Sequence, residues 1–427
     1  MREIVSRKIS GLHRMKKSFY SNLAFLLFVN LLVKPFWIFG IDRTVQNTVG
    51  AETYGLYFAL FNFSILFQIL LDFGINNFNN RAVAQDEDFI KRHLPDILSL
   101  KVMLSLAYAG VTLVAGLISG YGKFQIHLLL LLTANQILTS LLLYLRSNIS
   151  GMHLFKTDSV LSVLDKLLMI GICGWLLWGM QREQFQIEWF IYAQSVALLA
   201  TILAAAIVIL AKHGMLSLRW DVAGMKAIAL KTYPYALLGL LMTIYYRIDG
   251  VMLERMLPDG AREAGIYAAS FRLLDAANML GYLFASILLP MFARMLAKKE
   301  NVQSLVNGSL ALIMTGALAV VGVSVFFRSE IMLRLYPQST QYWSDIFGLL
   351  MPSFLGVCTV YIYGTLLTAN GSLKVLNSIA LGGMLLNILL NLLLIPQHKA
   401  LGATAATLIT QSVVAAAHVV AAKRVFR

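Results

Sequence analysis

The chain has 427 residues, of which 59% are hydrophobic and only 13% are charged, and its mean hydropathy is +0.73. Soluble chains carry about 25% charged residues, so this composition excludes an ordinary soluble protein. Apolar runs of about 20 residues, each long enough to cross the hydrocarbon of a bilayer, recur from end to end. The sequence therefore predicts an all-α polytopic membrane protein.

Twelve membrane spans are predicted in chain order, at 20–41, 53–73, 97–119, 124–145, 158–178, 187–211, 232–253, 265–292, 306–327, 344–368, 375–395 and 400–422. They divide the chain into a basic N-terminal segment (1–19), an N-lobe (20–211) of six spans, a linker (212–231) and a C-lobe (232–427) of six more. Apolar residues recur at helical spacing in the linker, which predicts either a helix in the membrane interface or a plain connection.

The net charge of +14 is distributed unevenly between the two sides of the membrane. The side that holds both termini carries 23 Lys and Arg residues, and the other side carries eight. Cytoplasmic loops are enriched in Lys and Arg, so we expect both termini in the cytoplasm. No small-residue cleavage site follows the first apolar run, so we expect span 1 to be retained.

The two halves share a sequence pattern. GAETYGLYFA (50–59) matches GAREAGIYAA (260–269) at a shift of 210 residues. Because each half has six spans, the two copies enter the membrane from the same side, which predicts a parallel repeat about an axis along the membrane normal. Two such lobes around a central site near the midplane are typical of transporters that work by alternating access.

Eight charged residues within the predicted spans are candidates for a site: Lys34, Asp72, Asp165, Lys166, Arg247, Asp249, Arg272 and Asp275. A charge at mid-bilayer costs roughly 2.5 kcal/mol or more, so it should face a cavity or a partner. By position along the spans, Lys34 is predicted in the outer part of span 1. Arg247 and Asp249 in span 7 are predicted at the level of Arg272 and Asp275 in span 8.

A secondary set of charges lies nearer the cytoplasmic surface. These side chains can reach water there, so a structural role is favoured over substrate binding. This set comprises Asp72, Arg81, Arg146, Asp165 and Lys166.

Helical spacing limits how the charges in spans 7 and 8 can pair. Arg272 and Asp275, at i,i+3, can pair on one face, whereas Arg247 and Asp249 point about 200° apart. One arrangement joins Asp249 to Arg272 and leaves Arg247 facing a cavity. Two interpretations stay open: a neutral ion-pair network that joins the two spans, or an anion site in a wet cavity with Lys34 from the other lobe.

Several functional classes lack their motifs. No phosphate-binding G-x-x-x-x-G-K-[ST] loop, H-E-x-x-H motif or paired-cysteine motif occurs. The two cysteines, Cys173 and Cys358, lie in apolar runs and are interpreted as packing residues. We therefore expect neither an enzyme nor a metal site, and no nucleic acid partner despite the positive charge.

Three stretches resemble the polysaccharide transporter family of oligosaccharide flippases, within the multidrug/oligosaccharidyl-lipid/polysaccharide exporter (MOP) superfamily. They are VGAETYGLYFALFNFSILFQILLDFGINNFNNRAVAQ (49–85), YYRIDGVMLERML…AGIYAASFRLLDAANML (245–280) and NILLNLLLIPQHKALGATAATLITQ (387–411). The resemblance covers nearly the whole chain in order. It implies twelve helices in two six-helix lobes, which form a V-shaped bundle around a cationic cavity.

The resemblance also implies the substrate, an oligosaccharide repeat unit on undecaprenyl pyrophosphate, carried from the inner to the outer leaflet of a bacterial inner membrane. Lys34, Arg247 and Arg272 are then expected to bind the pyrophosphate. Asp249 and Asp275 are expected to be counter-charges or to couple transport to H⁺ or Na⁺. No other cofactor is expected, and we expect a monomer that meets the polysaccharide polymerase of the same pathway.

Three other classes were compared with this prediction. An ion-coupled drug or metabolite exporter of the same superfamily would favour an acidic or aromatic cavity, whereas Lys34, Arg247 and Arg272 are basic. A lipid II-type flippase shares the chemistry but commonly has fourteen spans. A polysaccharide polymerase or ligase usually carries a larger outer loop than residues 327–344.

Overall fold

The computed structural model describes residues 28–76, 79, 83, 88–152, 154–179, 184–213 and 220–426. Every regular element within these ranges is a helix. The basic N-terminal segment 1–19, Arg81 and most of the first part of the linker lie outside the described residues.

The first half begins with a helical stretch at 28–36. The elements that follow are η1 (Trp37–Asp42), α2 (Arg43–Leu66), α3 (Ile69–Asp72), α5 (Asp88–Ile118), α6 (Lys123–Gly151), α7 (Phe155–Gly174), η2 (Trp175–Gly179) and α8 (Ile187–His213). The second half contains α9 (Val222–Met256), α10 (Gly260–Ala297), α11 (Gln303–Phe326), α12 (Arg328–Leu335), α13 (Gln341–Leu350), α14 (Ser353–Ala369) and α15 (Leu373–Val425).

Two backbone breaks account for the number of membrane crossings. In the described part of the chain, nine helices are long and apolar enough to span a bilayer. One of them, α15, is broken at Lys399 (φ 53°, ψ −131°) and forms spans 11 and 12. Likewise α2 is broken at Gly50 (φ 82°, ψ 165°), which separates span 1 from span 2. Counting α15 as two helices gives ten, and the stretches before and after Gly50, which are not among the nine, correspond to the remaining two of the twelve predicted spans.

The position of the first break corrects the predicted end of span 1. The helix continues through η1 to Val49 and does not end at residue 41. Glycine adopts the left-handed φ of Gly50 without steric cost, so the chain turns back there. Lys34 is 16 residues before this turn, or about 24 Å along the helix. The prediction that Lys34 lies in the outer part of span 1 depended on a helix end at residue 41, and the longer helix places Lys34 farther from the turn than that prediction assumed.

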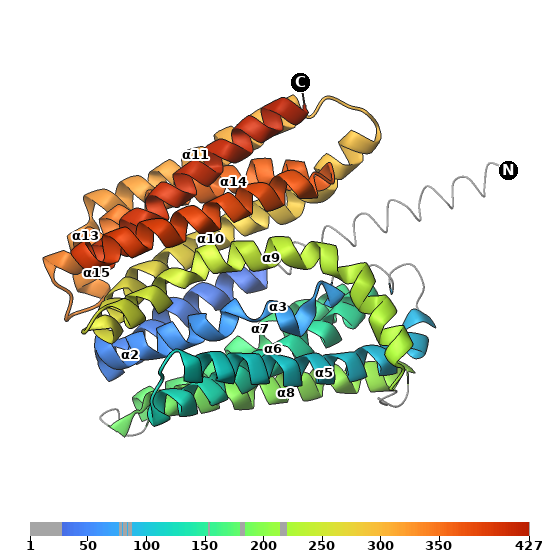
Figure 1. Cartoon of the computed structure of the whole chain (residues 1–427), viewed down its shortest axis with the longest axis horizontal. Coiled ribbons are helices and arrows are strands. Elements are labelled where there is room, and N and C mark those ends of the chain that lie inside the picture. The colour runs from blue at the N-terminus through green and yellow to red at the C-terminus, as the bar shows by residue number, and fades with distance from the viewer. Residues whose placement is uncertain are drawn as a thin grey trace.

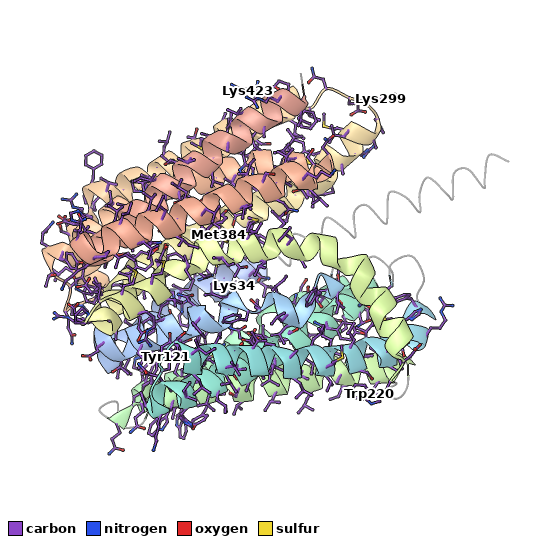
Figure 2. All side chains as sticks on the ribbon, in the orientation of Figure 1. Lys34, Tyr121, Trp220, Lys299, Met384 and Lys423 are labelled. Atoms are coloured by element: carbon purple, nitrogen blue, oxygen red, sulfur yellow. The ribbon has the colours of Figure 1, made fainter. Side chains whose placement is uncertain are left out.

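The two lobes form a V, with the first-half helices on one side and α10 to α15 on the other, while α9 runs between them and its beginning reaches the first-half helices (Figure 1). They meet at the end that carries the Gly50 turn, called the Gly50 end here. They diverge toward the end where Trp220, Lys299 and Lys423 lie, called the Trp220 end (Figure 2). One hydrophobic core includes residues of both halves, such as Phe58 and Phe271. A second core contains first-half residues only, between Ile75 and Ile209.

The lobes approach each other most closely where α2 crosses α10. A Cβ atom built on Gly55 would lie 1.8 Å from the carbonyl oxygen of Ala261. A Cβ atom on Gly265 would lie 1.8 Å from the carbonyl oxygen of Ala51. Small residues four apart let helix backbones touch in this way within membranes. The two contacts are symmetric, because Ala51 and Gly55 match Ala261 and Gly265 at the shift of 210.

The expected linker is partly helical. Residues 222–231 form the beginning of α9 and are continuous with span 7. The helix bends where it leaves the bundle at the Trp220 end (Figure 1).

Candidate functional site

Three adjoining cavities lie between the lobes. They measure about 500, 380 and 340 Å³, and Arg247 of α9 lines all three. Lys34 of the first half lines the largest and the smallest. The site is therefore built by both lobes, with Lys34 and Arg247 on opposite sides, and Lys34 lies near the middle of the long axis (Figure 2).

The lining of the largest and smallest cavities is predominantly cationic. Five basic side chains line them: Lys34, Arg146, Lys166, Arg247 and Arg272. Only two acidic ones do, Asp42 and Asp275. Two further carboxylates, Asp158 and Asp165, pair with Arg146 and Lys166 from outside the lining, so one positive charge remains without a partner among the described residues. Such a charge, only partly hydrated, attracts an anionic ligand.

Arg247 pairs with Asp275 of α10, with 3.4 Å between the guanidinium nitrogen Nη1 and Oδ2. Its guanidinium also lies over the rings of Tyr246 and Phe271, 5.3 and 5.4 Å from their centres. Both charged side chains keep about a fifth of their surface exposed. Arg247 is thus held in place while it still faces the cavity.

Arg272 makes an ion pair between the lobes. Its Nε lies 3.0 Å from Oδ2 of Asp42, at the end of η1. The Tyr54 hydroxyl donates to the same carboxylate oxygen at 2.8 Å and accepts from Arg272 Nε at 3.2 Å. The Arg272–Asp275 pair that the i,i+3 spacing allows does not form, because each residue has a different partner.

The predicted pairing of Asp249 with Arg272 is also wrong. Asp249 is 2% exposed and lies inside the second lobe. It accepts hydrogen bonds from Asn391 Nδ2 at 2.6 Å, the Tyr267 hydroxyl at 2.9 Å and the Thr407 hydroxyl at 2.5 Å. No basic side chain of the described residues lies within 4.0 Å, so these neutral donors satisfy the carboxylate.

Lys34 differs from the other cavity cations. Among the described residues, no carboxylate lies within ion-pair distance of its ammonium group, whereas Arg146, Lys166, Arg247 and Arg272 each have one. A partly buried cation without a counter-charge is costly in a membrane protein. The interpretation of these charges as a closed, neutral network therefore fails at Lys34.

The secondary candidates are ion-paired in the first lobe. Arg146 contacts Asp158 at 2.8 Å, and Lys166 contacts Asp165 at 3.2 Å. Asp72 accepts from Lys101 at 3.3 Å, and the same ammonium donates to the carbonyl of Leu71 and the hydroxyl of Ser140. Arg146 and Lys166 line the cavities, which joins them to the primary site.

Two residues of these networks were not among the sequence candidates. Asp42 lies one residue beyond the predicted end of span 1 at residue 41. Lys101 was counted at the mouth of span 3, but it is 4% exposed and satisfies the broken helix end at α3. The available signal for Asp42 was the helical spacing of the apolar residues Ile41, Val45 and Val49 in an otherwise polar stretch.

Two further sequence interpretations have structural counterparts. Cys173 and Cys358 are free and buried, which confirms that they are packing residues. The described residues include no group of three or more His, Cys, Asp or Glu side chains that could hold a metal ion.

Comparisons with solved structures identify the fold. An inward-facing MATE-family multidrug resistance transporter of the MOP superfamily aligns with a TM-score of 0.72 and 14% identity, covering 94% of this chain and 98% of that one. An outward-facing MATE structure gives 0.64 at 12% identity, covering 95% and 94%. A Pyrococcus furiosus MOP transporter, described by a binding pocket of reverse polarity that suggests a different function, gives 0.67 at 14% identity, covering 95% of each chain.

A search of curated proteins gave no match. The family described as "Polysaccharide biosynthesis protein" matches residues 19–296, which is more than half of the chain and includes Lys34, Arg247 and Arg272. The chain therefore belongs to the polysaccharide biosynthesis protein family and has the transporter fold of the MOP superfamily.

Proposed function

We propose that the protein is a flippase for lipid-linked oligosaccharides, which it moves across the bacterial inner membrane as polyprenyl pyrophosphate derivatives. The observation that carries the proposal is that Lys34, whose ammonium has no carboxylate partner among the described residues, lines a cavity between the lobes together with Arg247. A pyrophosphate diester carries two negative charges, and charge-assisted hydrogen bonds to ammonium and guanidinium groups would replace its hydration.

The proposed orientation places both termini and the Trp220 end in the cytoplasm, in accord with the Lys and Arg distribution. The V opens toward this end (Figure 1). Substrate would enter from the inner leaflet, with its pyrophosphate between Lys34 and Arg247 and its lipid tail in the bilayer. Transport would then require the lobes to separate at the Gly50 end and to close at the Trp220 end. The cavity is complete within one chain, so we propose that a monomer is sufficient.

Coupling to an ion gradient is assigned to Asp249. This carboxylate is buried without a basic partner and is held by Asn391, Tyr267 and Thr407 of neighbouring helices. Loss or gain of one positive charge, as H⁺ or Na⁺, would change its electrostatic cost in the membrane. Asp275 is assigned the role of counter-charge to Arg247. An entering pyrophosphate would compete with the Asp275 carboxylate for the Arg247 guanidinium.

The test is transport of a fluorescent, short-chain polyprenyl pyrophosphate that carries N-acetylglucosamine, measured in proteoliposomes. We expect Lys34→Met to abolish transport and Lys34→Arg to retain part of it, because arginine keeps the charge. Lys374→Met, which removes an exposed lysine, is the matched control. Normal transport by a folded Lys34→Met variant would overturn the proposal, as would transport of an organic cation in place of the lipid.

A further inference from the structure

The cavity of about 380 Å³ differs in chemistry from its two neighbours. It lies between the end of α2, which contributes Ile65, and helices α9, α14 and α15 of the second lobe. Apart from Arg247, the described residues that line it are uncharged. They include three tyrosines and two glutamines: Tyr245, Tyr246, Tyr361, Gln68 and Gln411. Aromatic faces beside a few polar groups are typical of specific sites for small molecules.

Two of the polar side chains are buried but have no partner. Gln411 is 3% exposed and Tyr245 is 5% exposed, and both line the cavity. Within the described part of the chain, neither the Gln411 amide nor the Tyr245 hydroxyl makes a hydrogen bond. Their polar atoms are not among the fully enclosed ones and open into the cavity, so they can exchange hydrogen bonds with a ligand that has donors and acceptors of its own.

The other tyrosines are fixed by their surroundings. Tyr246 accepts a hydrogen bond from Asn278 and donates to Asp275 Oδ1 at 3.3 Å. Tyr361 packs against Gly281 of α10, where a Cβ atom would lie 2.4 Å from the ring. A glycine at this position lets the ring lie directly on the helix. Rings held in this way offer flat apolar faces at low cost in side-chain entropy.

This cavity adjoins the cationic site. Tyr246, Arg247 and Tyr361 line both it and the cavity of about 500 Å³ that contains Lys34. A ligand that fills both would place an anionic group between Lys34 and Arg247. An uncharged, hydroxyl-rich group would then lie among the tyrosines and glutamines.

We propose that the Tyr245–Tyr361–Gln411 cavity binds the first sugar attached to the pyrophosphate. This inference rests on the proposed function. It assigns the carbohydrate part of the substrate to residues other than those that bind the pyrophosphate. The C–H face of a pyranose packs on a phenol ring. The sugar hydroxyl or acetamido groups exchange hydrogen bonds with the amide of Gln411 and the hydroxyl of Tyr245.

The test compares affinities of the purified full chain in lipid nanodiscs for matched probes. The reference probe is a short-chain polyprenyl pyrophosphate methyl ester, which has the same charge as a glycosylated diester. The sugar probes carry N-acetylglucosamine, galactose or glucose in place of the methyl group. We expect at least one sugar probe to bind more tightly than the methyl ester.

Gln411→Met keeps the volume of the side chain but removes its hydrogen bonds. We expect it to weaken binding of the preferred sugar probe about three- to tenfold, the effect of one or two neutral hydrogen bonds, and to leave the affinity for the methyl ester unchanged. Tyr361→Leu removes a ring and should act in the same direction, whereas Tyr361→Phe should act less. Gln303→Met, at an exposed glutamine, is the control. Binding of the methyl ester also reports that each variant is folded.

The outcomes separate this inference from the proposed function. Equal binding of all probes by the unaltered protein would overturn the sugar site, and so would Gln411→Met and Tyr361→Leu variants that both keep the sugar preference. A Lys34→Met variant that still binds the methyl ester normally would instead overturn the pyrophosphate site on which the proposed function depends.

Discussion

Gly55 and Gly265 lie against each other where α2 crosses α10, and they are equivalent residues of the two repeats. The backbone of each helix lies where a side chain at the glycine of the other helix would be. The contact therefore lies on the axis that relates the lobes, at the end where they meet. Alternating access requires this contact to open, so side chains here should affect stability and conformation together.

Gly265→Ala is expected to destabilise the observed conformation. The new Cβ would lie 1.8 Å from the carbonyl oxygen of Ala51, which is backbone and cannot move without shifting the whole helix. Overpacking typically costs about 1–3 kcal/mol, so we expect a lower thermal midpoint in detergent and wider separation of spin labels across the Gly50 end. Gly171→Ala is the control, because nothing lies within 4 Å of its Cβ. An unchanged midpoint and label distance would contradict close contact between the helices.

The Asp42–Arg272 pair is expected to show strong coupling in a double-mutant cycle. Removal of either partner leaves the other charge poorly compensated, which costs about 3–5 kcal/mol in a fully buried pair. We expect about 2 kcal/mol here, because both residues also line a cavity. Asp42→Asn, Arg272→Met and the double variant, measured by thermal unfolding, give the coupling energy. Additive effects would show that the pair does not hold the lobes together.

Asp249→Asn is expected to reduce both stability and ion dependence. All three contacts of the carboxylate are donors. In asparagine the NH₂ group would either meet the Asn391 amide and lose that hydrogen bond, or require the Tyr267 and Thr407 hydroxyls to turn and accept. The loss should cost about 1–3 kcal/mol. Transport by the folded variant should no longer vary with pH or Na⁺, whereas Asp345→Asn, in an exposed ion pair, should leave that dependence unchanged. An Asp249→Asn variant with unaltered ion dependence would remove the coupling role.

The Asp259–Lys399 pair, at the Gly50 end, should make a small, pH-dependent contribution to the free energy of unfolding. Lys399 donates to the Asp259 carboxylate at 2.6 Å, which lowers the pKa of Asp259 and raises the pKa of Lys399. The Asp259 contribution is present above the unfolded pKa of about 4 and is lost as pH falls through the lower folded value. The Lys399 contribution is present below the unfolded pKa of about 10.4 and is lost as pH rises through the higher folded value.

Thermal unfolding of Asp259→Asn across pH tests this prediction. Both side chains are exposed, so the difference from the unaltered protein should be small at neutral pH and should vanish below the folded pKa of Asp259. A difference that persists at acid pH would show that Asp259 acts in another way.

The fold and the cationic nature of the site could be predicted because they depend on sums over many residues. Span length, Lys and Arg distribution and the repeated Gly-Tyr pattern each report a property of whole segments. Lys34 and Arg247 were found because charges inside apolar runs need a cavity or a partner. Their facing positions also follow from the two-lobe arrangement.

The pairing of individual charges could not be predicted. Spacing along one helix fixes the angle between Arg272 and Asp275, but it does not give the rotation of that helix against its neighbours. Asp42 was missed for a different reason, because hydropathy alone does not mark a helix that crosses the membrane boundary without a break. Only a positive φ at Gly50 sets where span 1 ends.

The repeat that brings Gly55 to Gly265 relates the helices of the two halves, but it does not relate their charged side chains. At the same shift, Lys34 corresponds to Ile244, Arg247 to Trp37, Asp42 to Met252 and Arg272 to Asn62. Because both halves belong to one chain, each can carry its own side chains while the shared axis keeps them in register. A symmetric pair of identical six-span units would have to offer every charge twice. The fused chain can hold one end of an asymmetric molecule with one half and the other end with the second.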